Sequence, residues 1–229
     1  MAALVIGCMT PDLYRLFTQE SIALTHQWTG VLFPDLPIGL GFCLLWYLLY
    51  RPVVYRFLGL RDGLNLNSFD HFISFSLMSC MSVVIGIATH LIWDGLTHLD
   101  FRSFAFQNTL AQNVSLWNFH YPLHFILQIA SSIVTLPILW WMCRHYYQQY
   151  KAEKVSSKIR LFALISLVIS GASGLVSVWH SFHHLPLHLW HTERYFLIGR
   201  VLNQFTQAGL MLFSLFCLLF LFLDRKNRF

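Results

Sequence analysis

Five long stretches of this sequence contain no Asp, Glu, Lys or Arg, and this feature limits the possible folds more than any other. At a rise of about 1.5 Å per residue, a helix of about 20 residues crosses a hydrocarbon core about 30 Å thick. Of the 229 residues, 56% are hydrophobic and only 11% are charged, which is too apolar for a soluble domain of this size. We therefore predict one all-α integral membrane domain over residues 1–229, a polytopic bundle of about five transmembrane helices at 36–55, 72–93, 119–143, 161–179 and 201–223.

Basic residues between these spans predict the orientation of the bundle. They gather at the end of the first span and just after it, between the third and fourth spans, and at the C-terminus: Arg51, Arg56, Arg61, Arg144, Lys151, Lys154, Lys158, Arg160, Arg225, Lys226 and Arg228. Because Lys and Arg are enriched in cytoplasmic loops, we expect the N-terminus outside and the C-terminus in the cytoplasm. Membrane orientation also explains the net charge of +5, so we expect membrane lipids and no nucleic acid as partners.

Most of the histidines fall on or near the predicted outer side. Ten of the twelve do so: His26, His90, His98, His120, His124, His180, His183, His184, His188 and His191. Such a one-sided distribution suggests a polar site at the outer face.

The second predicted span ends in "ATHLIWDGLTH", in which His90, Asp94 and His98 are each four residues apart. On an α-helix this spacing places the three side chains along one slightly skewed stripe. Imidazole nitrogen and carboxylate oxygen are both ligands of divalent transition metals, and ionisable groups inside a membrane usually serve a function. The alternative is a core His90 hydrogen-bonded to a neighbouring helix, with Asp94 and His98 solvated at the interface.

Two upstream residues lie on the same predicted face. Asp12 follows a proline in "MTPDLYRLF", and His26 follows a threonine in "ALTHQWTG". Each is a weak signal alone, since a Pro-Asp pair is most often a turn or a helix cap. Together with the stripe, they complete a candidate site at the outer face.

Two further histidine clusters are open to more than one interpretation. "WHSFHHLPLHLWH", residues 179–191, is either metal-binding or an amphipathic interfacial segment, and "FHYPLHF" places His120 and His124 one turn apart.

The segments "LVIGCMTPDLYRLF", "LTHQWTGVLFPDLPIGL", "IGIATHLIWDGLTH" and "YPLHFILQIASSIVTLPILWW" resemble a bacterial membrane family of unknown function, domain of unknown function 4184. That family is similar to inner-membrane proteins labelled metal-dependent hydrolases. The resemblance covers roughly residues 3 to 145 and implies a multi-pass protein of the bacterial inner membrane. The family usually begins earlier, with a Ser-His-Pro-like segment. The positions that match its pattern are Asp12, His26, Asp35, His90, Asp94 and His98.

The leading hypothesis is a metal-dependent hydrolase-like membrane protein. A divalent ion, zinc first and manganese or iron as alternatives, would be held by His90, Asp94 and His26. His98 or Asp12 would act as general base or second ligand during attack on a lipid-borne or periplasmic ester, phosphoester or amide.

Two alternatives come from different classes of protein. His90, His124 and His180 lie near the same predicted membrane level, and two of them could ligate a haem. A non-catalytic membrane scaffold with interfacial histidines is the other alternative. A Soret band in the purified protein would favour haem, and bound zinc in a colourless protein would favour the hydrolase.

Overall fold

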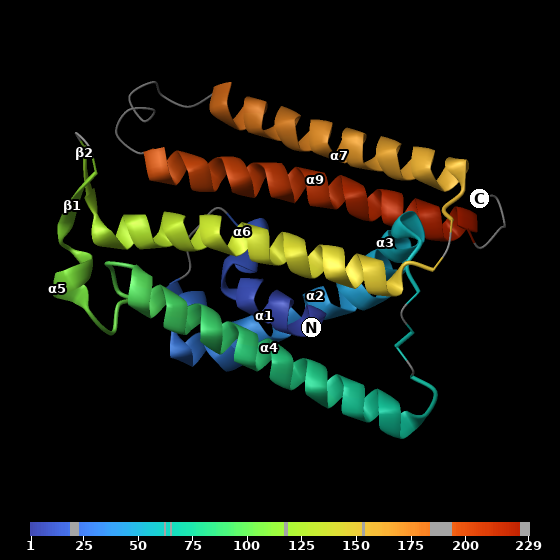
Figure 1. The fold of residues 1–229 in the computed structure, drawn as a ribbon, viewed down its shortest axis with the longest axis horizontal. Helices are drawn as coiled ribbons and strands as arrows, with labels where there is room; N and C mark the ends of the chain where they lie inside the picture. The colour runs from blue at the N-terminus through green and yellow to red at the C-terminus, as the bar shows by residue number, and fades with distance from the viewer. Residues whose placement is uncertain are drawn as a thin grey trace. The chain divides into compact units, whose positions relative to one another are not determined.

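Helices account for most of the chain in a computed structural model, which describes residues 1–18, 23–61, 63–64, 66–116, 119–152, 154–183 and 194–224 (Figure 1). Within these described residues, five helical segments are long and apolar enough to cross a membrane: Trp28–Leu58, Phe69–Thr97, Leu123–Tyr150, Ser157–His183 and Leu197–Asp224. The predicted helical fold with five candidate spans is therefore confirmed.

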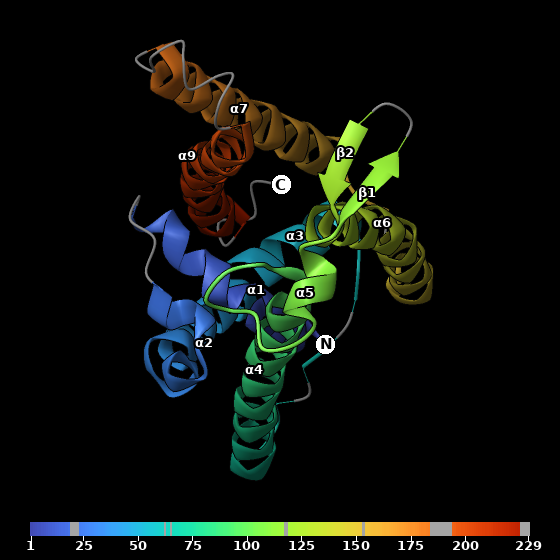
Figure 2. The ribbon, with the colours of Figure 1, turned by 90° about the vertical axis from the view of Figure 1, so that its left-hand side faces the viewer.

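The elements follow one another as α1 (Ala2–Leu13), η1 (Tyr14–Leu16), η2 (Ala23–His26), η3 (Trp28–Gly30), η4 (Val31–Asp35), α2 (Leu36–Leu45), η5 (Trp46–Tyr50), α3 (Arg51–Leu58), α4 (Phe69–Thr97), α5 (Gln107–Leu110), β1 (Asn113–Leu116), β2 (Phe119–Pro122), α6 (Leu123–Tyr150), α7 (Ser157–His183) and α9 (Arg194–Asp224). The helix expected from residue 119 begins at Leu123 instead. Strand β2 occupies Phe119–Pro122 and pairs antiparallel with β1, as Figure 2 shows.

The chain divides into two compact units, which we describe separately. The first contains Met1–Tyr14, Ser21–Cys43 and Asp62–Tyr150. The second contains Arg15–Glu20, Leu44–Arg61 and Lys151–Phe229.

In the first unit, α1 packs closely along α4 because glycines lie where the two backbones cross. A Cβ atom added to Gly7 would lie 2.4 Å from the carbonyl oxygen of Val83, and one added to Gly86 would lie 2.4 Å from that of Leu4. Small residues allow this approach, which is typical of helix pairs in membranes. The crossing brings the end of α1, with Asp12, to the C-terminal half of α4.

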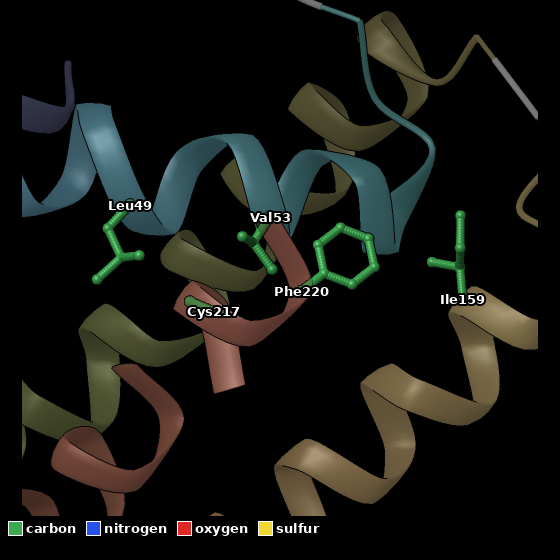
Figure 3. Close-up of a cluster of buried hydrophobic side chains, with 5 residues drawn as sticks. All are labelled: Leu49, Val53, Ile159, Cys217 and Phe220. Atoms are coloured by element: carbon green, nitrogen blue, oxygen red, sulfur yellow. The ribbon is translucent and has the colours of Figure 1, made fainter. Parts of the chain in front are cut away.

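In the second unit, α7 and α9 lie side by side (Figure 1). A small apolar core joins them to η5 and α3. Figure 3 shows its buried side chains, which are Leu49, Val53, Ile159, Cys217 and Phe220. A hydrogen bond of 2.7 Å between the hydroxyls of Tyr50 and Ser214 also links η5 to α9. This unit contains none of the residues of the candidate site described next.

Candidate metal centre

Two carboxylates and two imidazoles from three elements of the first unit converge near the C-terminal end of α4. Asp12 comes from the last turn of α1, His26 ends η2, and His90 and Asp94 are one turn apart on α4. Ligand atoms of Asp12, His26 and His90 all lie within 4.8 Å of one another, which marks them as a possible metal site.

The distances between facing atoms are those of a ligand cage. His26 Nε2 lies 3.4 Å from Asp12 Oδ1 and 3.8 Å from Asp94 Oδ2. His90 Nε2 lies 3.4 Å from Asp94 Oδ2 and 3.8 Å from Asp12 Oδ2. Two ligands at about 2.1 Å from a tetrahedral zinc ion are about 3.4 Å apart. The distances of 3.4 Å equal this separation and those of 3.8 Å exceed it slightly, so each imidazole lies where it can share an ion with either carboxylate.

The orientation of His90 is fixed by the backbone of α1. Its Nδ1 lies 2.7 Å from the carbonyl oxygen of Cys8, and because a carbonyl only accepts, Nδ1 donates. In a neutral ring the lone pair is then on Nε2, which is buried and has no hydrogen-bond partner among the described residues. A lone pair facing two carboxylates is repelled by them unless a proton or a metal cation lies between.

His26 is supported in a similar way. Its Nδ1 lies 3.0 Å from the hydroxyl oxygen of the buried Thr25, and Nε2 faces the carboxylates. The rings of His26 and His90 meet edge to face, with centroids 5.5 Å apart. A partner on the far nitrogen of each imidazole is the usual arrangement around metal-bound histidines.

Asp94 is buried and contacts different partners through its two oxygens. Oδ2 faces His90 and His26 and accepts a hydrogen bond of 3.2 Å from Arg102 Nη1. Oδ1 lies 3.5 Å from His98 Nδ1. Burial lowers the pKa of His98, and Arg102 acts in the same direction while Asp94 opposes it. His98 is thus placed to orient Asp94 from outside the cage.

A family match covers nearly the whole chain. Residues 1–222 match the model of the family described as Domain of unknown function (DUF4184). The chain belongs to this family. No curated protein and no solved structure matches it. The predicted DUF4184 resemblance is confirmed, while the likeness to metal-dependent hydrolases stays a prediction.

Asp35 is a further unusual residue of this DUF4184 chain. Its side chain is fully buried at the end of η4, and neither oxygen has a hydrogen-bond partner among the described residues. It is close enough to His90 to interact with it electrostatically. A buried carboxylate without partners is rare and is most often found where a protein has a functional need for it.

The other predicted histidines lie apart from this cage or outside the described residues. His120 pairs with Ser115 across the hairpin at 2.9 Å, and His124 is half-buried at the start of α6. His180 and His183 are on α7 in the second unit. His184, His188 and His191 lie outside the described residues.

Sequence reasoning missed the supporting groups around the cage. These are the Cys8 carbonyl, the Thr25 hydroxyl and the guanidinium of Arg102. A backbone carbonyl has no sequence signature at all. Asp100 and Arg102 lie six and eight residues after Asp94 in the sequence, but without a structure nothing related the pair to that carboxylate.

Proposed function

We propose that this chain is a metal-dependent, hydrolase-like membrane protein whose divalent cation is bound by Asp12, His26, His90 and Asp94. The observation that carries the proposal is the buried Nε2 of His90, which lacks a hydrogen-bond partner and faces two carboxylates. A divalent cation would offset the repulsion between these groups by coordinating the imidazole nitrogens and carboxylate oxygens that face one another.

The ligand set indicates the class of metal. Two imidazole nitrogens and two carboxylate oxygens suit zinc best, with manganese or iron as alternatives. Uncompensated buried charge costs several kcal/mol, so the nearly buried Asp94 gains most from a bound cation, beyond its contact with Arg102.

A bound zinc ion would act as a Lewis acid and would lower the pKa of a water ligand toward about 7. The side chain of Asp12 is 52% exposed, whereas those of His26 and Asp94 are 7% and 8% exposed. Substrate and water therefore reach the centre from the side of Asp12, which serves as a ligand or as a general base. His98 orients Asp94. An ester, phosphoester or amide, lipid-borne or periplasmic, is the proposed substrate.

The proposed location is the bacterial inner membrane, with the centre at the outer face. Supporting it are the Lys and Arg residues after the first span, between α6 and α7, and near the C-terminus. In this orientation the C-terminal end of α4, which carries Asp94, faces outward. His90 then lies seven residues inside that end, or about 10 Å along the helix.

Metal analysis of the full chain, purified in detergent, tests the proposal. Wild-type protein should contain about one zinc-class ion per chain, and His90→Ala and Asp94→Ala should each abolish stoichiometric binding in well-folded protein. His71→Ala is the matched control, because His71 is exposed near the other end of the same helix. Wild-type metal content in both cage variants, or no metal in the wild type, would contradict the proposal.

A further inference from the structure

Arg102 lies next to the proposed metal and has a role that the cage itself does not require. Its Nη1 donates to Asp94 Oδ2, the oxygen that also faces both imidazoles. The guanidinium is therefore one ligand away from the bound cation. The Arg102 side chain is only 16% exposed, and a guanidinium removed from water needs paired or hydrogen-bonded partners.

The turn that carries Arg102 is fastened to the end of α4. Arg102 Nε donates to both oxygens of Asp100, at 2.9 and 3.1 Å, and Nη2 also donates to Asp100. The hydroxyl of Ser103 donates to the carbonyl of His98, and the amide of Phe104 donates to that of Gly95 at 3.3 Å. These bonds hold the guanidinium in place before any ligand arrives. The pKa of Asp100 is lowered to about 2 by its hydrogen bond from Arg102, so the pair stays ionised.

Two of the guanidinium's donors have no partner among the described residues. An arginine has five N–H groups, one on Nε and two on each terminal nitrogen. Asp94 and Asp100 occupy Nε and one hydrogen on each of Nη1 and Nη2. One N–H thus remains on each of the two terminal nitrogens, and N–H groups of a guanidinium are good donors to phosphoryl oxygens.

The cationic groups beside the cage favour an anionic ligand. Arg102 and a divalent cation together balance the charges of Asp12, Asp94 and Asp100, the carboxylates that form ion pairs with the imidazoles or with Arg102. Asp35 interacts with His90 as well. An approaching anion is attracted by both cationic groups. A neutral ester or amide carries no charge before it reacts, so in binding it gains less from the guanidinium than an anionic phosphoester does.

We infer that Arg102 binds the phosphoryl group of a phosphoester substrate, an inference that rests on the proposed metal-dependent function. Of the three substrate classes proposed, it selects phosphoesters. The same segment exposes three phenyl rings, with Phe101 61%, Phe104 56% and Phe106 68% exposed. Apolar groups beside a phosphoryl site suit the acyl chains of a lipid phosphate, although a free phosphoester has the same headgroup chemistry.

The test is calorimetric titration of the zinc-loaded full chain with inorganic phosphate. Every variant is first saturated with zinc, and its metal content is measured. Wild type should bind phosphate, and Arg102→Gln should bind it at least about tenfold more weakly, because it loses both the charge and the free donors. Arg56→Gln is the matched control, since it breaks an arginine–aspartate pair of 3.3 Å in the second unit. Its phosphate affinity should equal that of the wild type.

Wild-type phosphate affinity in Arg102→Gln would overturn the inference, as would wild-type protein that holds zinc but binds no phosphate. A wild type without zinc would contradict the proposed function itself, and the inference would fall with it. Should Arg102→Gln fail to retain zinc, the phosphate affinity of Arg102→Lys is measured instead. This variant keeps the positive charge near Asp94 but loses the planar guanidinium with its several N–H donors. Its affinity should fall several-fold, and an unchanged affinity would overturn the inference.

Two competitors distinguish the source of the phosphoryl group. Phosphatidic acid in mixed micelles and glycerol 3-phosphate carry the same phosphomonoester with and without acyl chains. Competition by phosphatidic acid at much lower concentration supports a lipid phosphate. Equal competition supports the inference with a free phosphoester as the ligand.

Discussion

The close crossing of α1 and α4 at Gly86 should be essential for the proposed metal centre. In Gly86→Ala, the added Cβ would lie 2.4 Å from the carbonyl oxygen of Leu4 and 2.6 Å from the amide nitrogen of Cys8. Both atoms belong to the backbone of α1, so no side-chain rotation relieves the clash. Ordinary contact begins at 3.4 Å, and α1 therefore has to move away from α4 by about 1 Å.

Such a shift has two measurable consequences. Overpacking of this kind destabilises a protein by about 1–3 kcal/mol. The shift also lengthens the bond of 2.7 Å between His90 Nδ1 and the Cys8 carbonyl toward the limit of hydrogen bonding, and it moves Asp12 relative to His90. Metal sites tolerate distance errors of about 0.2 Å, and loss of a supporting contact alone costs about 10- to 100-fold in affinity. We expect zinc affinity to fall at least about tenfold.

Thermal unfolding in detergent and competition with a zinc indicator measure these two effects. Gly41→Ala is the matched control, because a Cβ at Gly41 in α2 meets nothing within 4 Å. It should leave zinc affinity unchanged and should not lower the unfolding temperature. Wild-type zinc affinity and stability in Gly86→Ala would refute the argument that this crossing positions the cage.

Three further predictions test other parts of the account. Thr25→Ala should lower zinc affinity about 10- to 100-fold in the same competition assay, while Thr25→Ser, which keeps a hydroxyl for His26, should lower it far less. Equal zinc affinities of the two variants would exclude a role of the Thr25 hydroxyl in supporting His26. Phe220→Ala should cost about 3 kcal/mol by leaving a cavity in the second unit, measured by denaturant or thermal unfolding, yet zinc content should stay at the wild-type value. In a background without the native cysteines, Lys154→Cys should react with an impermeant thiol reagent only from the cytoplasmic side and Gln107→Cys only from the outer side; the reverse pattern would overturn the proposed orientation.

The five long helices were predictable because hydrocarbon excludes charge, and the sequence shows directly where charge is missing. The lack of charge wrongly predicted a helix over Phe119–Pro122, which is uncharged but forms strand β2. Its partner is β1, with Val114 opposite Tyr121 and Ser115 opposite His120. Pairing between two segments is not visible in the charge pattern of either one.

For the candidate site, helical spacing predicted that His90 and Asp94 lie on one face of a helix, whereas topology predicted only that Asp12 and His26 lie on the same side of the membrane. The contact of Asp12 with His90 depends on the glycines that let α1 and α4 approach, a relation between residues about 80 positions apart. The role of Arg102 could not be predicted from the sequence for a different reason. Arg102 contacts Asp94 only because the chain turns back after the end of α4, at Asp100 and Ser103.

In X-ray absorption at the zinc edge of the zinc-loaded full chain, we expect two imidazole nitrogens and carboxylate or water oxygens at about 2.0–2.2 Å, and loss of one imidazole in His26→Ala. A sulfur ligand at about 2.3 Å, or a spectrum of His26→Ala identical to that of the wild type, would contradict this expectation.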